Sequence, residues 1–166
     1  MAVTSIDKDL DALTMRMTAE LDAPVARVWQ LWADPRQLER WWGPPMCPAT
    51  VVDHDLTPGG RVTYYLSLPD GTSPKGWWNV LRVDEHRVLE FEDGFADDSW
   101  NPDPDLPATS GRVTFVELDG GRTRMLIEMR FASTDDMERL LSMGMEEGTV
   151  ASLAQMDALV AEEARA

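Results

Sequence analysis

The side chain in this sequence that is best suited to chemistry is His54. It lies in the segment Val51 to Leu56, in phase with Val52 and Leu56, and this spacing predicts that it points to the inner side of a strand. An imidazole inside a cavity can orient a ligand or act as a general base near neutral pH. A hydrogen-bonded core histidine fits the same pattern. We therefore assign no catalytic residue and keep His54 as the one candidate.

Metal and nucleophile chemistry have little basis in this sequence. The two histidines and one cysteine show no His-x-x-x-His or Cys-x-x-Cys spacing, and the acidic stretch from Asp93 to Asp105 lacks the ligand pattern of a calcium loop. Cys47 lies between Met46 and Pro48, without a basic neighbour in sequence to activate its thiol. No Gly-x-Ser-x-Gly elbow and no phosphate-binding glycine-rich loop occur. We expect no metal, no cofactor, and a binding protein more than an enzyme.

The charge balance argues against two classes of partner. The 166-residue chain has 30 acidic and 15 basic residues, a formal net charge of −15. Nucleic acids and anionic membrane surfaces are bound through Lys and Arg, so we expect neither as a partner. No apolar run has the length of a membrane span, residues 1–11 do not resemble a signal peptide, and a lone cysteine allows no internal disulfide. These features predict a cytoplasmic protein.

The sequence predicts one α+β domain over residues 12–164, preceded by a flexible N-terminal segment, residues 1–11. Apolar and polar residues alternate from Leu13 to Leu21, the pattern of a half-buried strand. Pro24 and Pro35 are each placed at the first turn of a helical pattern. We therefore expect two short helices after the first strand.

The middle of the chain is typical of an antiparallel sheet, because its apolar segments are joined by short turns. The expected strands are Thr50 to Leu56, Arg61 to Leu68, Gly76 to Val83, Val88 to Glu92, and a last hairpin between Val113 and Met129. Together with the first strand they predict a curved sheet of about six or seven strands. The long acidic, proline-rich connection from Asp93 to Ser110 is the exception. We interpret it as an ordered lid, because the large aromatic side chains of Phe95 and Trp100 are expected to pack on other residues.

A long C-terminal helix completes the predicted fold. Ser133 to Asp136 carries hydroxyl caps and acids of a helix start, and the helical pattern runs to about Glu163. Gly144 and Gly148 are four residues apart, so they share one face of this helix. Small residues there allow either close packing on the sheet or room for a ligand.

Several of these segments resemble a known family. The stretch Pro24 to Pro35, the Trp-Trp-Gly-Pro motif within Leu38 to Pro44, and the Gly-Gly-Arg of Gly59 to Arg61 are similar to the activator of heat-shock protein 90 ATPase homologue-like family. This family is part of the START-like, or SRPBCC, helix-grip superfamily. Gly144 to Gly148 and Gly94 to Asp97 support the resemblance, which covers nearly the whole chain.

The resemblance implies a sheet wrapped around a long helix, with a ligand cavity between them in many relatives. Functions in the superfamily range from lipid and hormone carriers to polyketide aromatases and cyclases, so the fold alone does not decide the function. Many relatives pair, which leaves a homodimer open. The eukaryotic chaperone activators carry an additional N-terminal domain for which this chain has no room, so a direct chaperone partner is not expected.

We expect aromatic and methionine side chains from separate elements to converge on the helix and line such a cavity. An apolar ligand gains about 25 cal/mol for each Å² that it buries against surfaces of this kind. The alternative is that the same side chains fill the core completely. The candidate ligand-binding residues are Trp41, Trp42, His54, Tyr64, Leu66, Trp77, Phe91, Phe95, Phe115, Met129, Leu141 and Met145.

Three functions follow from these observations. The first is a protein that binds a small hydrophobic or aromatic molecule without catalysis. The second is an enzyme of the aromatase, cyclase or hydrolase type, which requires His54 or Tyr64 within hydrogen-bond reach of a carboxylate or water inside the cavity. The third is a protein-interaction or stress-related module, which requires a filled interior and an exposed apolar patch near Phe95 or Trp100.

Overall fold

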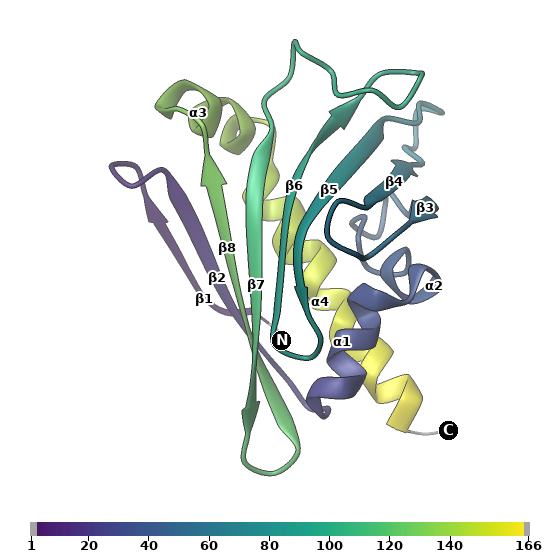
Figure 1. Ribbon diagram of the computed structural model, residues 1–166, viewed down its shortest axis with the longest axis vertical. Helices are drawn as coiled ribbons and strands as arrows, with labels where there is room; N and C mark the ends of the chain where they lie inside the picture. Colours follow the sequence, from purple (N-terminus) through teal and green to yellow (C-terminus); the bar gives the residue numbers. More distant parts are fainter. Residues whose placement is uncertain (1–2, 165–166) are drawn as a thin grey trace.

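The computed structural model describes residues 3–164 and shows an eight-stranded antiparallel sheet curved around a long C-terminal helix (Figure 1). The order of the strands in the sheet is β1-β2-β8-β7-β6-β5-β4-β3. The strands are β1 (Val3–Asp9), β2 (Thr14–Leu21), β3 (Ala49–His54), β4 (Arg61–Leu66), β5 (Lys75–Asp84), β6 (Val88–Ala96), β7 (Thr109–Leu118) and β8 (Arg122–Phe131). The helices are α1 (Val25–Ala33), α2 (Pro35–Leu38), α3 (Thr134–Ser142) and α4 (Met145–Ala164). This confirms the predicted α+β helix-grip fold, with eight strands in place of six or seven.

The additional strand comes from the N-terminal segment, for which the sequence predicts flexibility. β1 pairs with β2, and the Asp9 carboxylate accepts the N–H groups of Asp11 and Ala12 at 3.0 Å in the connecting turn. Val3 and Ile6 pack against the hydrophobic core. For residues 3–9 the prediction of a flexible segment is wrong. These residues form hydrogen bonds with the edge of β2, and no pattern within the segment itself indicates this pairing. Residues 1–2 lie outside the described range.

The two short helices lie between β2 and β3, as expected. Asp34 is the N-cap of α2 and its carboxylate accepts the N–H of Arg36 at 2.9 Å, while Pro35 occupies the first turn. α2 ends at Leu38, so Trp41 and Trp42 follow it in a turn. No helix in the described part of the chain combines the length and the apolar character required to cross a bilayer.

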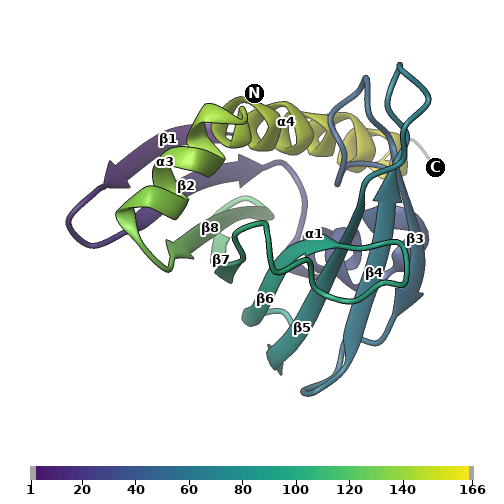
Figure 2. The same cartoon turned by 90° about the horizontal axis from the view of Figure 1, so that it is seen from above.

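The C-terminal helix is interrupted, which the sequence pattern does not predict. Ser133 begins α3, where its hydroxyl accepts the N–H of Asp136 at 3.1 Å. The chain then turns at Gly144, which has a φ of +90°, and α4 starts at Met145. Gly144 therefore lies between two helices, and the prediction that it shares a helix face with Gly148 is wrong. Figure 2 shows α3 and α4 on the concave side of the sheet.

Half of the concave face is packed solid against α1. Trp32 of α1 lies 4.6 Å from Trp41 between ring centroids, and Trp78 stacks on Phe91 at 4.2 Å with an interplanar angle of 15°. The indole N–H of Trp41 donates to the carbonyl of Leu31 at 2.7 Å. We call this half, with buried Trp78, Leu89, Val113, Phe115 and Met125 on the sheet, the closed half.

The acidic connection after β6 contacts the convex face at Trp100 and α3 at Asp105, and its role as a lid stays a prediction. β6 continues to Ala96. In the loop that follows, Pro107 lines a cavity beside α3, and Arg139 of α3 donates to the carbonyl of Asp105 at 3.0 Å. The part of the loop around Trp100 lies against the convex face. There the carbonyl of Trp100 accepts a hydrogen bond from Arg61 at 2.7 Å, and the Lys75 ammonium lies 5.4 Å from the Trp100 ring centroid. Arg61 and Lys75 point outward, because the next residue along each strand, Val62 or Gly76, faces inward.

The two glycines near the helix break predict opposite effects of the same substitution. Gly144→Ala is expected to lower the free energy of unfolding by about 1 kcal/mol or more, because a side chain disfavours a positive φ. Gly148→Ala is expected to raise it by about 1 kcal/mol, because Gly148 is inside α4 and an added Cβ meets no atom within 4 Å. Urea unfolding of both variants measures the difference, and equal effects would contradict the assigned break.

Candidate functional site

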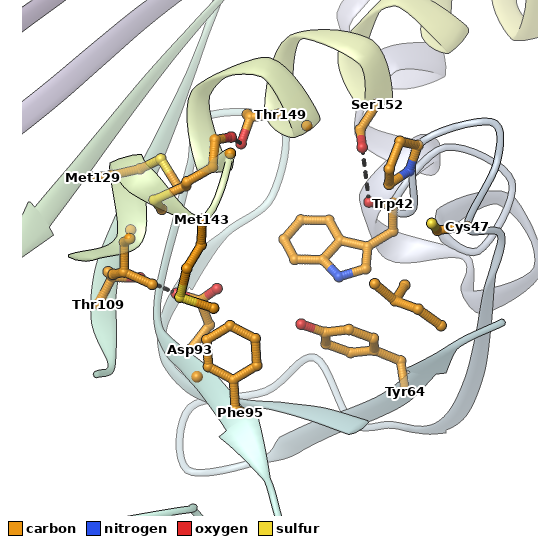
Figure 3. A pocket seen from close by; sticks show the side chains of 18 of the residues that line it. Trp42, Cys47, Tyr64, Asp93, Phe95, Thr109, Met129, Met143, Thr149 and Ser152 are labelled. Atoms are coloured by element: carbon orange, nitrogen blue, oxygen red, sulfur yellow. Dashed lines mark hydrogen bonds between the residues drawn. The ribbon is translucent and has the colours of Figure 1, made fainter. Parts of the chain in front are cut away.

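A cavity of about 470 Å³ separates the other half of the concave face from the junction of α3 and α4 (Figure 3). Its walls are mostly aromatic, aliphatic and methionine side chains from β4, β6, β8, α4 and the turn after α2. We call this part of the sheet, with Tyr64, Leu66, Asp93, Phe95 and Met129 facing the cavity, the open half.

Glycines opposite aromatic residues shape the sheet wall of the cavity. Tyr64 pairs with Gly76 on the neighbouring strand, and a Cβ on Gly76 would lie 2.3 Å from the Tyr64 hydroxyl oxygen. Phe91 pairs with Gly111, where an added Cβ would lie 3.3 Å from the ring. Both rings therefore reach across the adjacent strand, and both line the cavity, Phe91 at the border where Trp78 stacks on it.

The turn after α2 forms the opposite wall and is fastened to α4. The Ser152 hydroxyl donates to the carbonyl of Trp42 at 3.1 Å, and the Gln155 amide donates to the carbonyl of Gly43 at 2.7 Å. The Trp42 ring meets Tyr64 edge-on, with ring centroids 5.7 Å apart. These contacts hold the Trp42 indole inside the cavity, where Figure 3 shows it beside Tyr64.

Asp93 is the single charged side chain among the described residues that line the cavity. It follows Leu89 and Phe91 in the inward phase of β6, and its Oδ1 accepts the Thr109 hydroxyl at 2.5 Å. Burial raises the pKa of Asp93 to about 6, and the hydrogen bond from Thr109 opposes this rise. The carboxylate is thus mostly ionised at neutral pH, in a wall that is otherwise apolar.

Tyr64 supplies the second polar group of the cavity that is open to a ligand. Burial, and then the negative charge of Asp93, raise the pKa of its hydroxyl, while a hydrogen bond from Trp42 lowers it. The phenol therefore stays protonated and can donate or accept a hydrogen bond. The hydroxyls of Thr149 and Ser152 also line the cavity, but they donate to the backbone carbonyls of Met145 and Trp42.

The structure places most of the predicted ligand-binding residues around one space. Eight of them line the cavity: Trp41, Trp42, Tyr64, Leu66, Phe91, Phe95, Met129 and Met145. The other four, His54, Trp77, Phe115 and Leu141, do not line it. That these eight residues contact a ligand stays a prediction.

His54 faces the inner side of the sheet, but beside α1 and outside the cavity, and it is not in phase with Val52, which is exposed. The register of the β3–β4 pair shifts between Val51 and Asp53, so His54 pairs with Val62 and lies next to α1. Its Nε2 is 3.0 Å from the carbonyl of Trp32, a contact that requires the proton on this nitrogen. His54 thus fits the alternative interpretation of a hydrogen-bonded structural residue.

The remaining three residues lie on other surfaces. Trp77 is buried on the convex face, where its indole N–H donates to the carbonyl of Phe95 at 2.9 Å. Phe115 belongs to the closed half and meets Trp29 edge-on at 5.3 Å. Leu141 is half-buried on α3, and its neighbour Leu140 lines the cavity instead.

The sequence interpretation missed several lining residues, of which Asp93 matters most. The alternation Leu89, Phe91, Asp93, Phe95 places Asp93 on the inner face of a strand. The acidic, proline-rich composition after Glu92 indicates a loop, so the predicted strand ends before Asp93, whereas β6 continues to Ala96. Within the described residues, no group of three or more His, Cys, Asp or Glu side chains is arranged to hold a metal ion.

The buried carboxylate predicts a pH-dependent effect on stability. Because the pKa of Asp93 in the folded protein is about 6 against an ordinary value of 3.8, ionisation costs folding stability progressively between pH 4 and 6, at most about 3 kcal/mol. Asp93→Asn is therefore expected to raise the free energy of unfolding by about 2 kcal/mol at pH 7.5 and to leave it nearly unchanged at pH 4. Urea unfolding at both pH values measures this.

Glu92→Gln is the matched control, because Glu92 is the exposed neighbour on the opposite face of β6. It removes the same charge, and its effect is expected to be small at both pH values. If Asp93→Asn is less stable than the wild-type protein at pH 7.5, or if its effect is equal at the two pH values, ionised Asp93 does not lower the folding stability as predicted.

The chain matches the model of one protein family over residues 22–161, and the family is described as Activator of Hsp90 ATPase homolog 1-like protein. A search of curated proteins finds no match.

Solved structures with the same architecture include two that are similar in sequence over nearly their whole length. Protein Ms6760 from Mycobacterium smegmatis is 51% identical, with a TM-score of 0.87 over 95% of this chain and 96% of its own. A protein from Arthrobacter aurescens is 47% identical, with a TM-score of 0.92 over 96% of this chain and 92% of its own. The AHSA1 protein from Silicibacter pomeroyi, 24% identical with a TM-score of 0.69 over 90% of this chain and 99% of its own, shares the fold.

Proposed function

Because the chain belongs to the Activator of Hsp90 ATPase homolog 1-like family, whose START-like fold it shares, we propose that it binds a small hydrophobic or aromatic molecule between the sheet and α4. The observation that carries this proposal is the cavity of about 470 Å³ in the open half. Its volume is in the range of known small-molecule sites, and apolar walls with few polar groups are typical of them.

Binding without catalysis fits the polar groups of the cavity better than an enzyme of the aromatase, cyclase or hydrolase type. His54 lies outside the cavity, and the raised pKa of Tyr64 keeps this phenol protonated, so it is not available as a base at neutral pH. The hydrogen bond that Asp93 receives comes from Thr109, and none is present between Asp93 and Tyr64 in the described residues. An acid–base pair is thus not assembled in this geometry.

A protein-interaction module has less support than a ligand-binding protein. That function requires a filled interior, whereas Phe95 lines an open cavity. Trp100, the other expected anchor, is only half-exposed and lies under the Lys75 ammonium. A homodimer and a cytoplasmic location stay predictions from the sequence and its resemblance.

The proposal predicts that filling the cavity from α4 abolishes binding. Gly148 lines the cavity, and a Cβ built on it meets no atom within 4 Å, so the ring of Gly148→Phe is expected to occupy ligand space without a backbone clash. With 1-naphthalenemethanol as a neutral probe, titration calorimetry is expected to show binding to the wild-type protein and at least tenfold weaker binding to Gly148→Phe.

Ala154→Phe is the control, because Ala154 is exposed on the same helix and receives the same ring outside the cavity. Its affinity for the probe is expected to match the wild-type value within about twofold. If the wild-type protein does not bind the neutral probe, or if Gly148→Phe binds it equally well, the proposed function is wrong.

A further inference from the structure

We infer that the ligand of this cavity is an apolar, aromatic-sized molecule carrying a protonated amine, and that its ammonium group lies on Asp93. The inference rests on the proposed function, since it requires that the cavity binds a small molecule. It adds the chemical class of the ligand and the residue that selects it.

The first observation is the sign of the charge in the cavity wall. Asp93 is a carboxylate, and no Lys, Arg or His occurs among the described residues that line the cavity. A ligand carboxylate or phosphate would face this negative charge with no basic side chain to pair with it. Fatty acids and other anionic amphiphiles are therefore disfavoured when their head group enters the cavity.

The second observation is the unfinished hydrogen bonding of Asp93. Its Oδ1 accepts the Thr109 hydroxyl, and no ion pair of Asp93 is present among the described residues. A carboxylate can accept bonds at both oxygens, so Oδ2 is left for a ligand donor. A buried charge without a counter-charge is costly, and an ammonium group neutralises it while donating hydrogen bonds.

The third observation is the set of rings around the carboxylate. In Figure 3 the Phe95 ring lies next to Asp93, and the Tyr64 hydroxyl and the Trp42 indole face the same space from the other side. Aromatic faces attract cations as well as apolar skeletons, so the surroundings of Asp93 accommodate both parts of an aromatic amine. The net charge of −15 attracts cations to the protein at longer range.

Three probes with one skeleton test the inference: 1-naphthylmethylamine, 1-naphthalenemethanol and 1-naphthoic acid, titrated at pH 7.5 by calorimetry. The amine is expected to bind the wild-type protein at least tenfold more tightly than the alcohol, and the acid at least tenfold more weakly than the alcohol. Asp93→Asn is expected to lose at least tenfold in affinity for the amine and to keep the alcohol within about threefold, which also shows that the variant is folded.

Glu92→Gln controls for long-range charge, because it removes one negative charge from the convex face of the same strand. Its order of affinities is expected to equal that of the wild-type protein. If the alcohol binds as tightly as the amine, if the acid binds best, or if Asp93→Asn keeps the preference for the amine, the inference is wrong while the proposed function stands. If the alcohol also fails to bind, the proposed function itself is wrong.

Discussion

The cavity depends on the contact between two aromatic rings and the glycines of the neighbouring strands. Tyr64 lies over Gly76 and Phe91 lies over Gly111, at positions where a side chain on the glycine would collide with the ring or press on it. A ring that leans over a glycine occupies less of the space between the sheet and α4 than an upright ring, although Trp78 takes up part of that space beside Phe91. Tyr64 standing upright would reach into the gap between the sheet and α4, so the space there depends in part on the missing Cβ of Gly76.

The two halves of the concave face differ in packing, and the proposed binding function concerns only the open half. In the closed half, Trp32 and Trp78 pack with the aromatic residues around them at centroid distances of 4 to 7 Å, and this dense cluster fills the space between α1 and the sheet. In the open half the helix is interrupted at Gly144, and the wall includes an ionised carboxylate. The raised pKa of Asp93 predicts a loss of stability at neutral pH, and the proposed role of this residue in recognition would account for such a cost.

Family membership predicts the architecture of this protein but does not identify its ligand. The segments that carry the family resemblance, Pro24 to Pro35 and Leu38 to Pro44, build α1, α2 and the turn that is fastened to α4. Selectivity would reside in the residues that face the empty space, such as Asp93 and Tyr64. A shared fold with neighbours at 24% identity therefore says little about which molecule is bound.

Local patterns in the sequence were sufficient for the element types and for much of the cavity wall. Alternation in Leu13 to Leu21 and proline at the start of each short helix predict strand and helix correctly, because these signals depend on near neighbours in the chain. The family resemblance, which implies a cavity between the sheet and the helix, brings Trp42 and Tyr64 into one predicted site. Tertiary structure alone decided the rest: the edge of β2 that orders residues 3–9, the bulge after Val51 that sends His54 to α1, and the pairing with β7 that extends β6 to include Asp93. Each of these depends on hydrogen bonds between strands, and a pattern within one strand carries no information about its partner.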